Sequence, residues 1–299
     1  MTERLSVPLE SRGVLTVAGA DRRAFLQGLV SNDVELAAAD RAVHAAFLTP
    51  QGRYLHDLFI VEIGEALLLD AEAARRQDLL RRLSMYRLRS KVTLADASGE
   101  WTVRALLGGG AAASFGLPDE AGRAAPFAGG VVFVDPRLPG LGLRAVLPRD
   151  AAEAALAGHG FMPAPFAVYD RLRLGLGVPD GSRDLPVEKA ILLESGFDEL
   201  NGIDWKKGCY MGQELTARTK YRGLVRKRLM PVAIDGPAPP PGTPLTFDGQ
   251  DAGEMRSSFD GIGLALVRLE AAEAAAKAAR PIEAGEARLV PQRPEWAKF

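Results

Sequence analysis

A proline-dense segment, "DGPAPPPGTPL" at residues 235–245, constrains the fold of this chain more than any other stretch. Proline has no backbone N–H to donate and its φ is fixed, so the segment is excluded from helix and from the interior of a sheet. Strand-like runs lie on both sides of it, at residues 224–234 and 251–269. Short strands joined by turns are typical of a small barrel or sandwich. We therefore expect a C-terminal β-barrel domain over residues 222–299.

The sequence before this domain alternates strand-like and helix-like segments, which predicts an α+β fold. A helix is expected over residues 20–33, a hairpin over residues 42–62, and a basic amphipathic helix over residues 73–90. We expect an N-terminal α+β domain over residues 1–105, which shares its core with the later segment, and a middle α+β segment over residues 106–221.

Composition excludes several classes of protein. The 299 residues include 37 basic and 38 acidic side chains, so the net charge of −1 creates no global field toward nucleic acid or membrane. No apolar run approaches the roughly 18 residues of a membrane-spanning helix. The single cysteine excludes an intrachain disulfide and a zinc site built from several thiolates, and no resident metal is expected. With no apolar secretory segment in "MTERLSVPLESRG", a cytoplasmic location is expected.

The single cysteine, Cys209, lies in "GIDWKKGCYMGQELTART" at residues 202–219. The pKa of a thiol falls beside cations or at a helix N-terminus, and here Lys206 and Lys207 precede the cysteine while a helical run follows it. A buried small hydrophobe is the alternative, because free cysteine is among the most buried residue types. One thiolate cannot hold a four-cysteine cluster alone, so any cluster would be shared with a partner. Local chemistry leaves these alternatives open.

Asp57 and Glu194 are the carboxylates of interest, because each adjoins an apolar segment. In a concave site such a carboxylate can accept paired hydrogen bonds from a ring N–H and an exocyclic amine. The alternative for each is a surface or cap residue. Of the histidines, only His56 is placed for function, while His44 and His159 are expected to be structural. A hydrolytic triad of His56, Asp57 and the distant cysteine is a weak alternative.

The motif "KGCYMGQELTAR" at residues 207–218 resembles the K-G-C-Y-x-G-Q-E motif of YgfZ-type folate-binding proteins, in the superfamily of the glycine-cleavage T-protein. Residues 171–232 are most similar to the mitochondrial iron–sulfur maturation branch of that family. Weaker matches occur in the family's order at "FLQGLVSND" (25–33), "LTPQGRYLHDLFI" (48–60), "YRLRSKV" (86–92) and "GLALVR" (263–268). The resemblance implies a three-part fold around a central folate cavity, with a C-terminal β-barrel.

The resemblance also implies a cofactor, tetrahydrofolate or another reduced folate. In the T-protein a P-x-E segment supplies the glutamate that holds the pterin, and "LLES" at residues 192–195 falls in that place. This assigns the role to Glu194, with Glu188 of "PVE" as the alternative. The T-protein's catalytic aspartate corresponds to Asp57, but His56 replaces the aspartate before it, which argues against glycine cleavage.

The cysteine motif implies that Cys209 is a reactive thiol or a transient cluster ligand, with Lys207 lowering its pKa. Asp57 is expected to contact the folate as well. The remaining residues assigned to folate binding lie in the matched segments and are Tyr86, Arg87, Trp205, Tyr210, Gln213, Glu214 and Arg218.

Three functions are consistent with this reading. The first is a tetrahydrofolate-binding accessory protein for assembly or repair of iron–sulfur clusters, which indirectly supports iron–sulfur enzymes including tRNA-modifying ones. Its partners would be the folate and iron–sulfur assembly or client proteins. The second is a folate-dependent aminomethyltransferase that uses Asp57 as acid or base. The third is a binding module that uses the basic helix around residues 75–89. Stable binding of nucleic acid or membrane is not expected.

Overall fold

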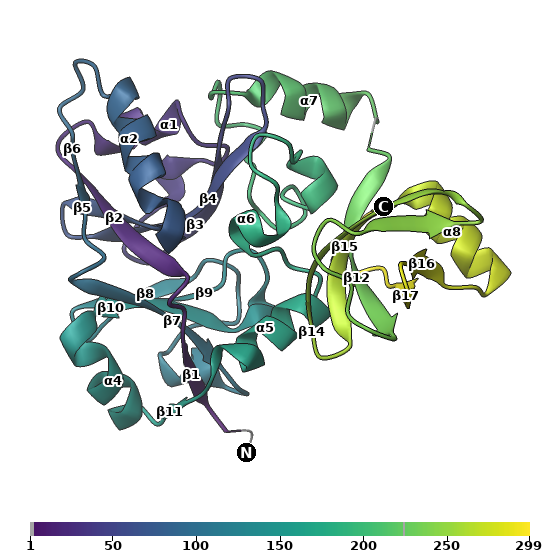
Figure 1. Cartoon of the computed structure of the whole chain (residues 1–299). Helices are drawn as coiled ribbons and strands as arrows, with labels where there is room; N and C mark the ends of the chain where they lie inside the picture. Colours follow the sequence, from purple (N-terminus) through teal and green to yellow (C-terminus); the bar gives the residue numbers. More distant parts are fainter. Residues whose placement is uncertain (1–2, 224) are drawn as a thin grey trace. The chain divides into compact units, whose positions relative to one another are not determined.

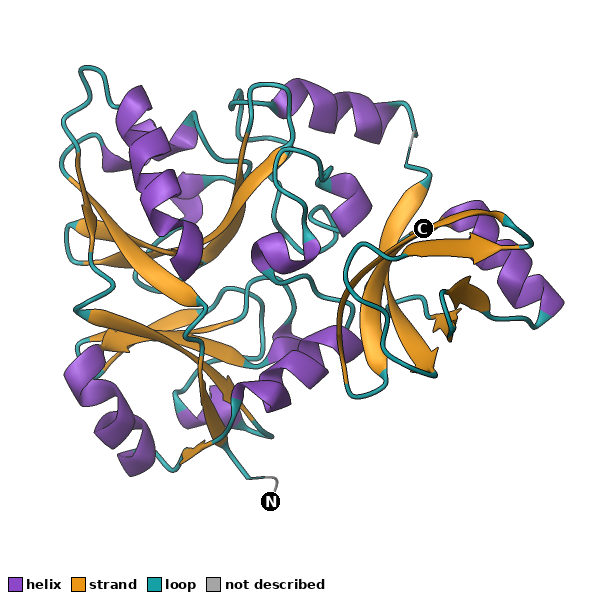
Figure 2. Ribbon diagram, in the orientation of Figure 1, coloured by secondary structure: helices purple, strands orange, loops and turns teal. Residues whose placement is uncertain are grey.

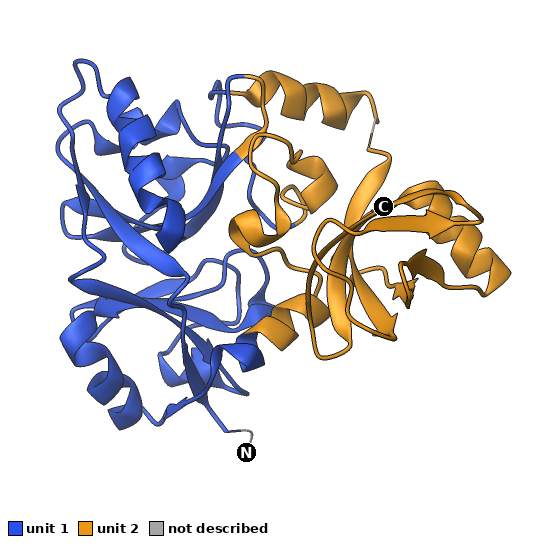
Figure 3. Ribbon diagram, in the orientation of Figure 1, with its two compact units in different colours: residues 1–50, 55–169, 200–211 blue, residues 51–54, 170–199, 212–299 orange. Residues whose placement is uncertain are grey.

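The computed structural model describes residues 3–223 and 225–299 and divides the chain into two compact units (Figure 3). Unit 1 comprises residues 1–50, 55–169 and 200–211, and unit 2 comprises residues 51–54, 170–199 and 212–299. Both units mix helices with mainly antiparallel sheet (Figure 2), as the α+β prediction requires. The domain boundaries expected at residues 105 and 221 stay a prediction.

Unit 1 contains two sheets. The six-stranded sheet has the order β11-β1-β7-β10-β9-β8, with strands β1 (Leu5–Pro8), β7 (Trp101–Leu107), β8 (Ala124–Phe127), β9 (Gly130–Val134), β10 (Leu143–Pro148) and β11 (Met162–Pro163). The five-stranded sheet has the order β3-β4-β5-β2-β6, with strands β2 (Arg12–Ala18), β3 (Val43–Leu48), β4 (Tyr54–Ile63), β5 (Ala66–Glu72) and β6 (Thr93–Asp96). The expected hairpin is confirmed as the neighbouring strands β3 and β4.

The helices of unit 1 are short. They are α1 (Arg22–Gln27), α2 (Arg76–Tyr86), α3 (Ala111–Ser114) and α4 (Arg149–Gly158), with 3₁₀ turns η1 (Val34–Leu36), η2 (Ala73–Arg75) and η3 (Pro139–Leu141). The helix expected over residues 20–33 is wrong in its length, because α1 ends at Gln27 and Val30 forms an antiparallel bridge with Phe47. Helix α2 buries Leu79 and Leu83 and packs against β2 and β6 (Figure 1).

Unit 2 contains a closed barrel with the order β12-β15-β14-β13-β16-β17, which confirms the expected C-terminal barrel. Its strands are β12 (Lys227–Asp235), β13 (Pro244–Phe247), β14 (Gln250–Phe259), β15 (Ile262–Arg268), β16 (Ile282–Ala284) and β17 (Ala287–Pro291). The other elements are α5 (Phe166–Gly175), which starts in unit 1, α6 (Gly181–Asp184), η4 (Leu193–Ser195), α7 (Gln213–Tyr221) and α8 (Leu269–Ala278). The first residue of the strand expected from 224, Leu224, lies outside the described residues.

The proline-dense segment connects β12 to β13 within the barrel. It is held by backbone hydrogen bonds from Gly242 to Met255 and from Met255 back to Thr243. Apolar side chains from the strands fill the barrel, and helix α8 adds Ala275 to the same core. No helix in residues 3–223 or 225–299 is both long and apolar enough to cross a membrane.

A buried ionic cluster joins the two sheets of unit 1. Asp70 on β5 accepts hydrogen bonds from Arg12 on β2 at 2.6 Å and from Arg144 on β10 at 2.6 Å. Arg12 also pairs with Asp57 at 3.1 Å, and Arg144 lies 3.8 Å from Asp135. All five side chains are at most 9% exposed. Each charge in the cluster therefore depends on its partners, since water cannot replace them.

An aromatic ring organises the guanidinium groups of this cluster. Phe59 on β4 lies 3.9 Å from the guanidinium carbon of Arg144, 4.8 Å from that of Arg137 and 5.4 Å from that of Arg12. Arg137 completes the cluster through Asp135, at 2.8 Å. Desolvated cations over an aromatic face gain electrostatic stabilisation from the ring. The two sheets are thus held by charge and cation–π contacts as well as by apolar packing.

Asp70→Asn should destabilise unit 1 by about 3–5 kcal/mol, because it leaves two buried arginines without their shared counter-charge. Thermal and urea unfolding measure the effect. Asp248→Asn is the matched control, since Asp248 pairs with Arg280 at the same 2.6 Å but both side chains are 56% exposed. It should change stability by less than about 1 kcal/mol. Equal losses in the two variants would contradict a special role for the cluster.

Candidate functional site: an anchored thiol segment

The segment that carries Cys209, residues 200–211, is fixed to the loop that follows α1. Asp204 N–H donates to Ser31 O, and Ser31 Oγ donates to Gly202 O at 2.6 Å. At the other end, Met211 N–H donates to Gly28 O at 3.0 Å. The segment thus returns to unit 1 and is tied down on both sides of the cysteine.

Lys207 anchors the middle of this segment. Its ammonium donates to Val30 O and to Asn32 O, each at 2.6 Å, and lies 5.4 Å from the ring centroid of Tyr210. Burial lowers the pKa of Lys207 to about 8, against the opposing charges of Asp33 and Asp204. With two of its three N–H donors bound to backbone carbonyls, Lys207 serves first to hold the segment. Its predicted effect on the pKa of the Cys209 thiol stays a prediction.

Cys209 itself is exposed, so the alternative of a buried small hydrophobe is wrong. Gly208 and Gly212 flank it with φ of +93° and +80°, a backbone region that glycine adopts at no steric cost. The expected helix begins directly after them, at Gln213. The backbone therefore bends at Gly208 and at Gly212, and Cys209 is exposed between these two bends.

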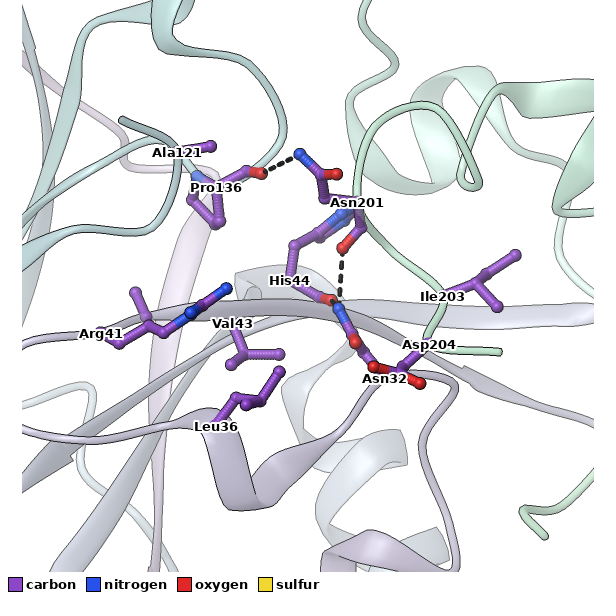
Figure 4. A pocket seen from close by; sticks show the side chains of 11 residues that line it. Asn32, Leu36, Arg41, Val43, His44, Ala121, Pro136, Asn201, Ile203 and Asp204 are labelled. Carbon is purple, nitrogen blue, oxygen red and sulfur yellow. Dashed lines mark hydrogen bonds between the residues drawn. The ribbon is translucent and has the colours of Figure 1, made fainter. Parts of the chain in front are cut away.

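A cavity of about 330 Å³ lies beside this segment in unit 1 (Figure 4). The side-chain amide of Asn32 donates to the backbone carbonyls of His44 and Asn201, at 2.7 Å each, and so joins one wall to the thiol segment. His44 Nδ1 lies 3.3 Å from Leu200 O. Burial, followed by the charge of Arg137, lowers the pKa of His44 to about 4. The histidine is neutral near pH 7 and donates through Nδ1, as expected for a structural residue.

Asp57 is part of the ionic cluster. Burial opposes its ionisation, but Arg12 outweighs that effect and holds the pKa of Asp57 far below its usual value. Its neighbour His56 is buried, with Nε2 at 3.2 Å from Asp78 and a pKa lowered to about 4 by burial and by Arg75. A carboxylate locked in the charged state and a neutral histidine turned toward a helix do not form a proton relay with Cys209. This geometry gives no support to the hydrolytic triad.

Glu194 lies in unit 2, in the 3₁₀ turn η4, and lines a cavity of about 220 Å³. Apolar walls come from Ile191, Leu229 and Leu266, and Arg256 adds a cation. Burial raises the pKa of Glu194, against the opposing charges of Lys227 and other cations. Within the described residues its carboxylate forms no hydrogen bond or ion pair. Its acceptor atoms are therefore available to a ligand in this cavity.

The other predicted folate residues are dispersed. Tyr86 ends α2 and contacts Phe47 edge-on with ring centroids 6.3 Å apart, and Arg87 follows as the C-cap. Trp205 is 37% exposed, whereas Tyr210 is buried beneath the Lys207 ammonium.

In unit 2, Gln213 is the first residue of α7. Glu214 and Arg218 form an exposed ion pair of 2.7 Å with each other on the same helix. Glu188 adopts a φ of +61° in a turn and donates its backbone N–H to Tyr54 O. Of the assigned residues, the structure thus brings Lys207, Cys209 and Tyr210 together.

Sequence reasoning missed Ser31 and Asn32, the polar residues that receive the thiol segment. Both lie in "FLQGLVSND", where a run of three polar residues directly follows an apolar helical stretch. This change from apolar to polar residues is the sequence signal that could have indicated Ser31 and Asn32 as contact residues. No group of three or more His, Cys, Asp or Glu side chains suited to a metal ion occurs among residues 3–223 and 225–299.

Comparisons with known proteins match this architecture. Residues 226–299 match the family described as "CAF17, C-terminal beta-barrel domain". The human protein "Iron-sulfur cluster assembly factor IBA57, mitochondrial" is 35% identical, over 96% of this chain and 84% of its own length. The corresponding protein of Pyricularia oryzae is 34% identical, over 88% of this chain and 71% of its own length.

A solved structure shows the same fold. The glycine cleavage system aminomethyltransferase T from Bartonella henselae superposes with a TM-score of 0.76 and covers 99% of this chain and 87% of its own. Its sequence identity is 16%, so the likeness concerns the fold. The T-protein-like fold and the C-terminal barrel expected from the sequence are confirmed.

The cytoplasmic location expected from the sequence is wrong. The relatives from human and from Pyricularia oryzae are both named as mitochondrial proteins. A single unpaired cysteine is compatible with any reducing compartment, so cysteine usage could not distinguish the cytoplasm from a mitochondrial location.

Lys207→Met should release the thiol segment, because it removes both hydrogen bonds to backbone carbonyls. Amide hydrogen exchange over residues 203–211 should become at least about tenfold faster, since even one charge-assisted hydrogen bond contributes about 1.5–3 kcal/mol and tenfold corresponds to about 1.4 kcal/mol. Lys206→Met is the matched control, because only the backbone N–H of Lys206 bonds to Asp204. Unchanged exchange in Lys207→Met would show that the ammonium is not the anchor.

Proposed function

Because this chain belongs to the family of the IBA57 iron–sulfur cluster assembly factors, we propose that it acts as an accessory protein for the assembly or repair of iron–sulfur clusters. Its partners are then iron–sulfur assembly proteins or the enzymes that receive clusters, tRNA-modifying enzymes among them. We further propose that it binds tetrahydrofolate or another reduced folate. The observation that carries the proposal is the exposed Cys209 on a segment that unit 1 holds in place.

Cys209 is the group that would meet the cluster. A thiol binds iron as its thiolate and releases its proton on binding. One thiolate leaves the other cluster positions open, and residues 3–223 and 225–299 supply no cluster of further ligands. The remaining ligands must come from a partner or a second chain, which makes Cys209 a transient ligand or an exchange thiol. Holding the segment in advance reduces the entropy lost when partner and thiol meet.

The cavity around Glu194 fits the pterin end of a reduced folate. A half-buried carboxylate without a protein partner can accept two parallel hydrogen bonds from a ring N–H and an exocyclic amine. The apolar side chains of Ile191, Leu229 and Leu266 offer surfaces for a flat heterocycle. Bound folate supplies nitrogens that carry one-carbon units. Glu194 would bind and orient the ring, while the walls exclude water.

An aminomethyltransferase is the less favoured function. Its chemistry needs a group near the folate that gives or takes a proton close to neutral pH. Asp57, the aspartate that the resemblance assigns to this role, is held in the charged state by Arg12 inside the ionic cluster. A carboxylate with so low a pKa is a poor acid and a weak base at pH 7.

Cys209→Ser should abolish rescue of cells that lack the native gene while leaving the affinity for tetrahydrofolate within about twofold. Serine keeps the shape of the side chain, but its hydroxyl stays protonated and does not replace a thiolate on iron. Growth of the complemented strain and the activity of its iron–sulfur enzymes measure the rescue. Full rescue by the serine variant would remove the role of the thiol.

Glu194→Gln should weaken tetrahydrofolate binding about 10- to 100-fold, because it removes the charge from a paired hydrogen bond. Calorimetric titration of the purified full chain with tetrahydrofolate measures the effect. Glu188→Gln is the control, since Glu188 is the other glutamate that the resemblance allows. A loss confined to Glu188→Gln would transfer the role to that residue, and no binding in the wild type would reject the folate proposal.

A further inference from the structure

The turn that follows α2 places a leucine where the backbone favours glycine. Ser90 N–H donates to Arg87 O at 2.8 Å and closes a β-turn with Leu88 and Arg89 at its centre. Leu88 has a φ of +42°, whereas Arg89 is not among the positive-φ residues. A positive φ at the first central position alone is characteristic of a type II′ turn, which normally has glycine there. A side chain in this conformation is strained.

The strained leucine points into solvent. Leu88 is 87% exposed, the largest value for a large apolar residue in the described part of the chain, and Met85 beside it is 57% exposed. Neither side chain contributes to the core of unit 1. The strain at Leu88 is therefore not compensated by packing within this chain.

Positive charge surrounds this turn. Each arginine of α2 has an acidic partner within the unit, since Arg76 pairs with Asp96 at 2.8 Å and Arg81 and Arg82 share Asp78. Arg87 and Arg89 are exposed, and neither side chain forms an ion pair or hydrogen bond within residues 3–223 and 225–299. Among the described residues, the arginines of this basic segment that have no acidic partner therefore lie at its C-terminal end, on both sides of Leu88.

We propose that residues 85–89, the docking turn, insert Leu88 into an apolar pocket on a partner protein whose rim carries carboxylates. The pocket buries the leucine and compensates the strain of its turn, and the carboxylates pair with the two free arginines. A membrane surface fits less well, because interfacial binding needs a continuous apolar face and this turn exposes two strongly apolar side chains.

The docking turn does not rest on the function proposed above. It contains Tyr86 and Arg87, which are predicted folate contacts, so its test uses Leu88 and Arg89, which have no assigned role in folate or cluster binding. Failure of the folate or cluster proposals leaves it intact, and its own failure leaves them intact.

Photo-crosslinking identifies the partner. The full chain carrying p-benzoylphenylalanine at position 88 is expressed in its own cells, with position 290 as the control because Val290 on β17 is 54% exposed. We expect one protein to crosslink from position 88 and not from position 290, through an apolar peptide with adjacent Asp or Glu. No crosslink above the control, or a peptide without acidic residues, would overturn the proposal.

Variants then separate binding from folding, with the purified partner as probe. Leu88→Gly relieves the strained φ, so it should leave Tm unchanged or raise it by about 2–3 °C while weakening binding about tenfold or more. Arg89→Glu should weaken binding similarly, and reversing a rim carboxylate to arginine on the partner should restore it. Unchanged binding by Leu88→Gly would reject the docking turn. So would Leu88-dependent flotation with phosphatidylcholine–phosphatidylserine vesicles.

Discussion

Unit 1 depends on one interaction: the carboxylate of Asp70 bridges Arg12 and Arg144, accepting a hydrogen bond from each. The two arginines come from different sheets, so a single carboxylate fixes the distance between those sheets. Burial makes this arrangement costly to form and costlier to break, because a lone guanidinium cannot be rehydrated inside the protein. The ring of Phe59 lies 3.9 Å from the guanidinium carbon of Arg144 and adds a cation–π contact to the charged ones.

The same cluster also supports the thiol segment indirectly, through the contacts that Phe59 makes. Phe59 stacks on His44 with ring centroids 5.1 Å apart, and His44 in turn meets Leu200, the first residue of the segment. Asn32 adds a second connection through its two amide hydrogen bonds. An exposed cysteine thus rests on a continuous series of buried contacts. That accounts for how a thiol at the surface can hold a fixed position without a metal or a disulfide.

Patterns of neighbouring residues predicted the strands and the barrel that contacts between nearby residues stabilise. Apolar runs around a turn predicted β3 and β4, and the proline-dense segment with short strands on both sides predicted the barrel. Helix α1 was predicted too long, because tertiary pairing of Val30 with Phe47 overrides a helical pattern of apolar residues. The ionic cluster could not be predicted, since Arg12, Asp70 and Arg144 are far apart in sequence and each reads locally as a surface charge. The sequence indicates only that Lys207 is a neighbour of the thiol. The fold shows that its ammonium donates hydrogen bonds to the backbone carbonyls of Val30 and Asn32, which are far away in sequence.

The order of the chain has a consequence for synthesis. Unit 1 is interrupted after residue 169 and resumes at residues 200–211, so the ribosome delivers its last segment only after 30 residues that belong to unit 2, 170–199. Until that segment arrives, Ser31 and Asn32 have no partners for their hydrogen bonds to Gly202 and Asn201. The loop must close over the intervening residues before the bonds form, which makes this a late event in folding. The thiol therefore reaches its working position only after residues 200–211 have been synthesised and have bonded to Ser31 and Asn32, near the start of the chain.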